Sequence, residues 1–427
     1  MAWPRARIAW VAGAVVATLA ATLVVVNLIP PERRVHERIE HRYAVGSQPF
    51  FRSLGVLLGP PTLDGNLVSG LQNGEEIFPA MLAAIRGAKR TITFETYIYW
   101  SGEVGRAFAD ALAERARSGV RVHVLLDWVG SQRIDERLLA QMRDAGIEIE
   151  LYRPLHWYHL ARFNNRTHRK LLVVDGRVGF TGGVGIADKW EGHAQDADHW
   201  RDSHYRAEGP VVAQMQATFV DNWSKARGAL LHGDDYFPPV DARDGVRAQM
   251  FASSPEGGSD SMQLMYLLAI TSATRSIALA SAYFVPDELT TDALVAAQKR
   301  GVRVRILVPG PIIDTGVVRR ASRAGWEPLL AAGAEIHEYQ PTMFHCKVMV
   351  VDELLASVGS TNFDVRSFRL NDEANLNVYD AAFARAQLDV FERDLKQSQR
   401  VTLEAWRARP WREKLVERLA ATIAWQL

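Results

Sequence analysis

Cysteine is almost absent from this 427-residue sequence, in which Cys346 is the only one. A single cysteine excludes an internal disulfide and any metal cluster built from several cysteines. An excess of one charge is also missing, because 50 lysines and arginines stand against 49 aspartates and glutamates. Dedicated nucleic-acid-binding proteins usually carry a clear basic excess, so we expect no nucleic-acid partner. The chain is 48% hydrophobic with ordinary glycine and proline contents, which predicts one large or two medium globular domains.

Charged residues are missing from one long stretch near the start of the chain. Residues 8–26 form an apolar run of roughly 19 residues. A helix rises about 1.5 Å per residue, so a run of this length can cross a bilayer. We therefore expect residues 1–45 to be an N-terminal membrane anchor with a basic segment after it, and a cleaved signal peptide is the alternative. The arginines that follow, Arg33, Arg34, Arg38 and Arg42, favour a location of the rest of the chain on the cytoplasmic side of the cell membrane.

The rest of the chain contains an internal repeat. Each copy holds three short β-branched runs separated by amphipathic helical stretches. These runs cover residues 90–99, 119–127 and 146–152 in the first copy and 275–284, 301–308 and 333–339 in the second. The alternation is typical of a sheet covered by helices. We therefore predict an α/β fold made of two similar halves that arose by duplication.

Composition also suggests where the segments divide. Glycine, proline, aspartate and serine gather in residues 228–262, which we expect to link a first half at 46–227 to a second half at 263–400. Residues 401–427 carry tryptophans and leucines among arginines and lysines, the pattern of an amphipathic helix. Such a helix either rests on lipid or packs against the body.

Each half ends in the same motif, His-x-Lys-x4-Asp. Residues i and i+2 of a strand point to the same side, so each histidine and its lysine face one site. The aspartate has the opposite parity, and in the first half Gly176 follows it, which predicts a hairpin turn and a supporting role. The candidate catalytic residues are therefore His168, Lys170 and Asp175 in the first half and His345, Lys347 and Asp352 in the second.

A pseudo-twofold arrangement of the halves would bring two imidazoles and two ammonium groups to one place. Concentrated positive charge of this kind favours an anionic ligand, and phosphate is the natural candidate. We expect no metal site, because the lysines repel a cation and no carboxylate cluster lies within ligand spacing. The active site is therefore expected between the halves.

At these motifs the sequence resembles the phospholipase D superfamily, and within it the bacterial cardiolipin synthase branch. The resemblance covers roughly residues 70–427, and its further motifs are residues 94–99, 125–131, 359–367 and 370–373. It implies a duplicated phospholipase D-like α/β/α sandwich that needs no cofactor. The sequence departs from the family at Gly185, where an asparagine is common, so the two halves of the site are not expected to be identical.

The resemblance also implies roles for the histidines. His168 is expected to attack phosphorus and form a phosphohistidine, while His345 protonates the departing alcohol and then deprotonates the acceptor. Asp202 and Glu373 lie about thirty residues after their histidines and are expected to orient the imidazoles.

The resemblance further implies that Lys170 and Lys347, together with Ser360 and Asn362, bind the nonbridging oxygens of the phosphate. His156, His159, Arg162 and Arg166 precede the first motif and either bind a headgroup phosphate or form a solvated basic loop.

The leading interpretation is a membrane-bound phosphatidyltransferase that makes cardiolipin from phosphatidylglycerol, with anionic phospholipids and the membrane as its partners. One alternative keeps the site but uses water as acceptor, which gives a phospholipase D that releases phosphatidic acid. A phosphodiesterase nuclease is a further alternative, disfavoured by the balanced charge and the apolar run. A non-enzymatic scaffold would require a degraded site, whereas both motifs are intact.

Overall fold

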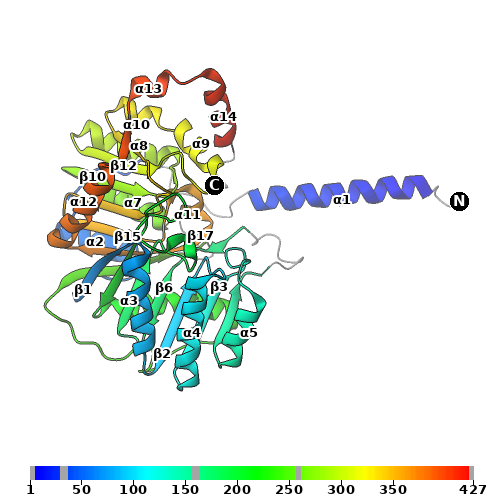
Figure 1. The fold of residues 1–427 in the computed structure, drawn as a ribbon. Coiled ribbons are helices and arrows are strands. Elements are labelled where there is room, and N and C mark those ends of the chain that lie inside the picture. Colours follow the sequence, from blue (N-terminus) through cyan, green and yellow to red (C-terminus); the bar gives the residue numbers. More distant parts are fainter. Residues whose placement is uncertain (1–4, 29–36, 155–163, 256–260, 423–427) are drawn as a thin grey trace.

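The two sequence repeats form two halves that share one sheet (Figure 1). The computed structural model describes residues 5–28, 37–154, 164–255 and 261–422. Each half is a layered α/β unit, as the alternating sequence pattern predicts, and the two lie one above the other in Figure 1.

The β-branched runs of the first repeat become three neighbouring parallel strands, β2 (Thr91–Thr96), β3 (Arg121–Asp127) and β4 (Glu148–Tyr152). The other strands are β1 (Leu63–Gln72), β5 (Arg166–Thr167), β6 (Leu171–Val174), β7 (Val178–Gly182) and β8 (Ser203–Glu208). The helices are α2 (Gln48–Leu57), α3 (Asn73–Gly87), α4 (Glu103–Arg117), α5 (Glu136–Asp144), the short 3-10 helix η2 (Asp188–Trp190) and α6 (Val211–Arg227).

The second repeat follows the same plan, with parallel strands β10 (Ser276–Ser281), β12 (Arg303–Pro309) and β13 (Glu335–Tyr339). Its other strands are β9 (Val246–Ser253), β11 (Phe284–Val285), β14 (Lys347–Val351), β15 (Leu355–Gly359), β16 (Phe363–Asp364), β17 (Asn371–Tyr379) and β18 (Ser398–Val401). Its helices are α7 (Ser261–Ser272), α8 (Glu288–Lys299), α9 (Gly316–Ala324), α10 (Glu327–Ala331), α11 (Val365–Arg369), α12 (Ala381–Leu395), α13 (Leu403–Arg407) and α14 (Trp411–Ala421).

The sheet runs from one half into the other without an edge between them. Its strand order is β18-β13-β12-β10-β14-β15-β17-β9-β1-β8-β7-β6-β2-β3-β4, and β5 pairs with β17 beside this path. The junction is antiparallel, because β9 pairs with both β1 and β17. Part of the segment expected to be a linker is therefore strand β9, and it fixes the two halves relative to each other.

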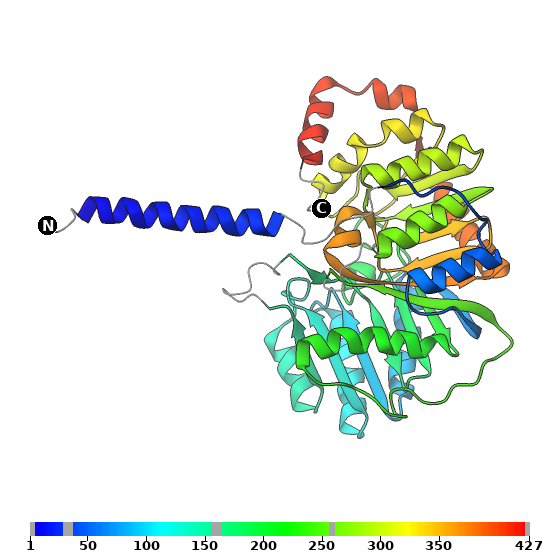
Figure 2. The ribbon, with the colours of Figure 1, turned by 180° about the vertical axis from the view of Figure 1, so that it is seen from behind.

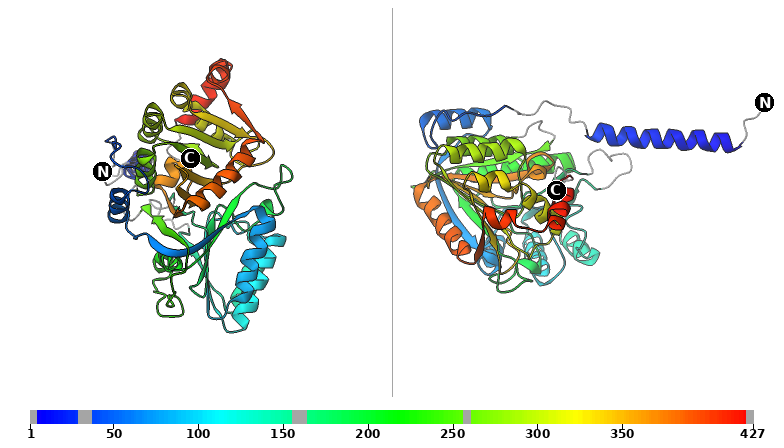
Figure 3. Two further views of the ribbon diagram at one scale, coloured as in Figure 1. Left: turned by 90° about the vertical axis from the view of Figure 1, so that its left-hand side faces the viewer. Right: turned by 90° about the horizontal axis from the view of Figure 1, so that it is seen from above.

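Three hydrophobic clusters hold helices against this sheet. One packs α3, α4 and α5 on the first half, and a second packs α2, α7, α8 and α10 on the second half. A third contains residues of α6 and α12 together with the central strands β9 and β17. Helices therefore cover the sheet on more than one face, as the views from behind and from the side show (Figures 2 and 3).

Helix α1 (Arg5–Leu28) stands apart from the body in each of these views (Figures 2 and 3). Its apolar side chains face outward; Trp10 is 82% exposed and Val16 is 65% exposed. Within the part of the chain that the structure describes, no helix combines the length and apolar character of a membrane-crossing segment. The transmembrane anchor expected from residues 8–26 therefore stays a prediction, and Arg33 and Arg34 lie outside the described residues.

The C-terminal helix α14 packs on the body with one face and exposes the other. Its Ala420 is buried in a small cluster with Val318 of α9, while Trp411 and Leu419 are exposed. Residues 411–421 thus form a helix in the expected segment, with one face against the body and an apolar face turned outward.

Candidate active site

The aspartates of the two motifs stabilise turns and do not belong to the catalytic site. Asp175 directly follows β6 and has a φ of 52°, and its carboxylate accepts the backbone N–H groups of Lys89, Arg90 and Thr91. Asp352 in turn accepts the N–H groups of Thr274, Arg275 and Ser276. Neither aspartate lines the cavity described below. Their inclusion among the catalytic residues is therefore wrong, and the supporting role at a turn is what the structure shows.

The two histidines lie at matching places, a few residues before the β6 and β14 strands. The backbone N–H of His168 donates to the Asp372 carbonyl at 2.9 Å, and that of His345 donates to the Arg201 carbonyl at 2.7 Å. Each of these bonds joins one half to the other. Each motif lysine also donates through Nζ to the carbonyl of its own histidine, which keeps the lysine close to the imidazole.

Each histidine contacts a carboxylate that comes from the other half. His168 Nδ1 lies 2.9 Å from Glu373 Oε1, and His345 Nδ1 lies 2.7 Å from Asp202 Oδ2. Both acids are fully buried. Asp202 and Glu373 are thus placed to orient the imidazoles, but the expectation that each acid serves the histidine before it is wrong. The reason is topological, because β5 pairs with β17 and Arg201 bridges to Phe344 across the halves.

Each acid has its own supporting donors. Ser360 Oγ donates to Glu373 Oε2 at 2.5 Å, and Ser360 is buried away from the cavity. The expectation that Ser360 binds phosphate is therefore wrong, because its hydroxyl holds the acid. On the other side, Trp190 Nε1 donates to Asp202 Oδ2 at 2.9 Å and the Ser203 N–H donates to Oδ1 at 2.8 Å.

Trp190 is a site residue that the sequence analysis missed. Its ring centroid lies 5.5 Å from that of His345, and its indole N–H is fixed on the orienting acid. The ring centroid of Trp200 lies 5.4 Å from that of the same imidazole. A signal was present in the sequence, since both tryptophans lie between the first motif and Asp202.

Packing around Trp190 also explains the glycine at position 185. A Cβ atom on Gly185 would lie 2.9 Å from Ile98 Cβ and 3.1 Å from the Trp190 ring, so an asparagine has no room there. Its counterpart Asn362 lines the cavity, and its Oδ1 is buried without a hydrogen bond to any described residue. Of these two matching positions, only 362 places an asparagine on the cavity, so the two halves of the site are not identical.

Burial and like charges set the ionisation of the site. Burial, together with Lys170, lowers the pKa of His168 to about 4 despite the opposing Glu373 carboxylate. Burial and the nearby Lys347 lower the pKa of Lys170 to about 7. Burial and Lys347 likewise lower the pKa of His345. A neutral imidazole is a competent nucleophile, and these crowded ammonium groups gain stability from an anion between them.

The pKa values of the two acids are also lowered, which in their case favours the charged form. Burial alone would raise the pKa of Asp202 and of Glu373, but the charge and hydrogen bond of the facing histidine outweigh it, so both pKa values are lowered. Both carboxylates are therefore ionised at neutral pH. An ionised acid fixes the proton on Nδ1 of its histidine and leaves Nε2 to face the cavity.

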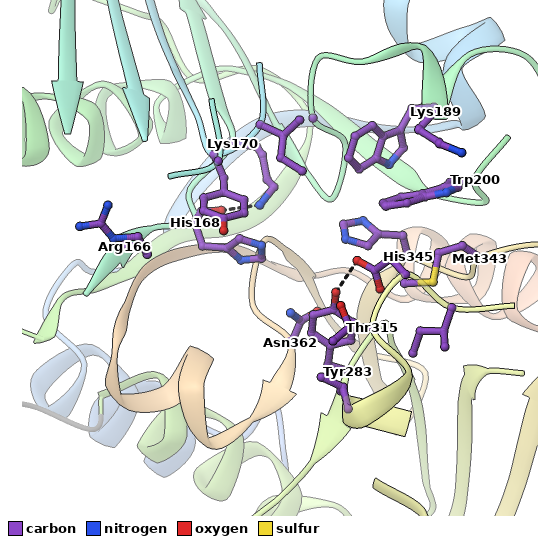
Figure 4. A pocket seen from close by; sticks show the side chains of 18 of the residues that line it. Arg166, His168, Lys170, Lys189, Trp200, Tyr283, Thr315, Met343, His345 and Asn362 are labelled. Carbon is purple, nitrogen blue, oxygen red and sulfur yellow. Dashed lines mark hydrogen bonds between the residues drawn. The ribbon is translucent and has the colours of Figure 1, made fainter. Parts of the chain in front are cut away.

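His168, His345 and Lys170 open into one cavity of about 780 Å³ between the halves. His168 and His345 face each other in Figure 4, with Arg166 beside His168, Trp200 beside His345, and Lys189 beyond Trp200. The cavity can therefore hold more than one phosphate group. In the residues available for description, no group of three or more histidine, cysteine, aspartate and glutamate side chains has an arrangement that could hold a metal ion.

The basic segment before the first motif is described only in part. Arg166 lines the cavity and lies 3.6 Å from Asp127 in an ion pair. His156, His159 and Arg162 lie outside the described residues. Their expected contact with a headgroup stays a prediction.

Comparisons with known proteins point to one family. The family described as "Cardiolipin synthase, PLD-like domain" matches residues 81–223 and 266–395. Cardiolipin synthase 1 of Bacillus anthracis is 36% identical over 369 residues, which are 84% of this chain and 72% of that protein. The major cardiolipin synthase of Bacillus subtilis is 35% identical over 350 residues, 81% of this chain and 72% of that protein.

Among solved structures, a phosphatidylserine synthase of Haemophilus influenzae superposes with a TM-score of 0.68 at 14% identity. The match covers 88% of this chain and 97% of that one. At this identity the likeness concerns the fold alone.

Proposed function

The chain belongs to the phospholipase D-like cardiolipin synthase family and is a phosphatidyltransferase, and on this premise we propose that it transfers a phosphatidyl group to phosphatidylglycerol through a phosphohistidine. The observation that carries the proposal is the crossed pair of His–carboxylate contacts on one cavity. Two imidazoles held in this way can act in turn as nucleophile and as acid–base.

In the first step His168 Nε2 attacks the phosphorus of the donor lipid and a P–N bond forms. The P–O bond to the headgroup breaks, and protonated His345 delivers its Nε2 proton to the departing oxygen. The bound phosphate counters the charge of Lys170 and Lys347, and its negative charge favours the protonated form of His345. Lys170, Lys347 and Asn362 neutralise the nonbridging oxygens, whose charge grows as the phosphorus becomes five-coordinate.

In the second step His345, now neutral, takes the proton of the acceptor hydroxyl. The acceptor oxygen attacks phosphorus, the P–N bond breaks, and His168 is restored. If the acceptor is a second phosphatidylglycerol, the products are cardiolipin and glycerol. If the acceptor is water, the product is phosphatidic acid.

A product analysis tests this proposal. The purified full chain is incubated with phosphatidylglycerol vesicles in a chelator, and lipids and free glycerol are quantified. Equal amounts of cardiolipin and glycerol are expected, and the His168→Ala and His345→Ala variants should form neither. Phosphatidic acid as the sole lipid product would replace the synthase by a hydrolase. Full activity in either histidine variant would exclude the two-histidine mechanism.

We also propose that α1 holds the body at a lipid bilayer, with the body in the cytoplasm. Support comes from the outward-facing apolar side chains of α1 and from the separation of this helix from the body. The full chain should remain with membranes during an alkaline carbonate wash, whereas a chain without residues 1–36 should be released. External protease should not cut the body in intact spheroplasts. Cleavage there would reverse the orientation.

A further inference from the structure

The cavity extends beyond the phosphate-binding centre on the side of His345. Lys189 lines it there, next to Trp200 in Figure 4. This position belongs to the short helix η2, between Asp188, which accepts the first N–H groups of α4, and Trp190, which holds Asp202. The Lys189 carbonyl also accepts the Trp200 N–H at 2.7 Å. The backbone of Lys189 is therefore fixed relative to the His345 imidazole.

The duplication places a second cation at the matching position. Lys189 lies 21 residues after His168, and Arg366 lies 21 residues after His345. The register is confirmed nearby, because Ile186 pairs with Tyr99 as Phe363 pairs with Phe284, in parallel fashion. Both Lys189 and Arg366 line the cavity.

The two matching cations differ in how they are held. The Arg366 guanidinium donates to both the side chain and the carbonyl of Asn164, which fixes it. Lys189 contacts Asp198 at 3.0 Å, with the lysine 41% and the aspartate 83% exposed. An exposed ion pair of this kind contributes little to stability, so the ammonium can exchange Asp198 for a phosphate at small cost.

We propose that Lys189 binds the phosphate of the acceptor phospholipid. This inference rests on the proposed transfer reaction. Because His345 deprotonates the acceptor hydroxyl, the acceptor headgroup lies on the His345 side. In a glycerophosphate headgroup the reacting hydroxyl is separated from its own phosphate by three carbons, so that phosphate lies in the same part of the cavity. Lys170 and Lys347 are occupied by the reacting phosphate, and Lys189 supplies the additional positive charge.

The consequence is a preference for an anionic acceptor. Water and free glycerol have no phosphate for Lys189, whereas phosphatidylglycerol does. A charge-assisted contact to phosphate at a partly exposed site corresponds to roughly a ten-fold change in binding. Lys189 is thus a specificity-determining residue, and the nucleophilic step does not depend on it.

The test compares two acceptors for the same phosphohistidine. Full-length protein is incubated with phosphatidylglycerol vesicles and radiolabelled glycerol. Cardiolipin formation reports an anionic acceptor, and label entering phosphatidylglycerol reports a neutral one. In Lys189→Gln we expect the ratio of cardiolipin to labelled phosphatidylglycerol to fall about ten-fold, with glycerol exchange unchanged. Lys189→Arg should retain the ratio, and so should the control Lys299→Gln, whose exposed lysine on α8 is outside the cavity.

Two results would overturn the inference. An unchanged ratio in Lys189→Gln would show that the acceptor phosphate binds elsewhere, and an equal loss of both products would show that Lys189 acts on the fold or on the shared first step. Failure of the proposed function looks different. In that case the unmodified protein itself forms phosphatidic acid and no cardiolipin, which removes the inference together with its premise.

Discussion

The two orienting acids should respond unequally to the same chemical change. Glu373→Gln and Asp202→Asn each replace a carboxylate by an amide of the same shape, so neither opens a cavity. Both remove the negative charge behind an imidazole. A charge-assisted hydrogen bond contributes about 1.5–3 kcal/mol against about 1 kcal/mol for a neutral one, so turnover should fall by roughly two- to thirty-fold in each variant.

Stability should separate the two variants. The supporting donors on Glu373 are the Asn371 amide at Oε1 and the Ser360 hydroxyl at Oε2. Asn371 can keep its bond to the retained amide oxygen, and Ser360 can turn its hydrogen toward the Ala374 carbonyl 3.3 Å away and accept from the new amide. The donors on Asp202 are the Trp190 indole N–H and the Ser203 backbone N–H, and neither can become an acceptor. An asparagine there must leave a buried donor unpaired, which costs about 1–3 kcal/mol.

The assays are initial rates of cardiolipin formation and urea unfolding of the same preparations. Glu373→Gln should unfold at the midpoint of the unmodified protein, and Asp202→Asn should unfold at lower urea. Asp389→Asn, at an exposed position of α12, serves as control for both measurements. The reasoning is refuted if Glu373→Gln keeps full turnover, or if both variants lose the same free energy of unfolding.

Three further outcomes are expected. Because the pKa of His168 is lowered to about 4, its imidazole stays neutral at pH 7. The rate of transfer should therefore fall only as the pH drops below about 5. In rates measured from pH 4 to 8, a fall already near pH 6.5 would contradict this. Gly185→Ala should lower the free energy of unfolding by about 1–3 kcal/mol and slow turnover by displacing Trp190, whereas Gly316→Ala, with open space at its Cβ, should change neither in melting and rate measurements. Cys346→Ser should retain turnover within about two-fold, because the thiol is buried outside the cavity; inactivation of this variant would show that the thiol takes part.

Local patterns were sufficient to predict much of the fold and the centre of the site. The β-branched runs of both repeats form the parallel strands β2, β3 and β4 and their counterparts β10, β12 and β13. The i, i+2 spacing placed each histidine beside its lysine, because strand geometry is set by neighbours in the chain. The opposite parity of Asp175 and Asp352 likewise predicted that they hold turns.

Contacts between the halves could not be predicted, since spacing along the chain does not tell which strands meet across a junction. Glu373 lies 28 residues after His345 but contacts His168, because β17 pairs with β5 and β9. The same limit applies to β9 inside the expected linker. Ser360 was misassigned because a serine near a phosphate site can serve either the phosphate or the acid behind it, and only the position of Glu373 decides.

The crossed acids have a consequence for the chain while it is being synthesised. His168 is synthesised 205 residues before Glu373. Strand β1 is likewise synthesised well before its partner β9. Until those later strands arrive, the first half exposes a sheet edge, and its buried histidine and lysine lack their counter-charge. A truncated chain is therefore an unstable fragment without activity toward lipids. Chemistry at this site begins only when β17 has joined the sheet, so incomplete copies cannot attack a phosphodiester.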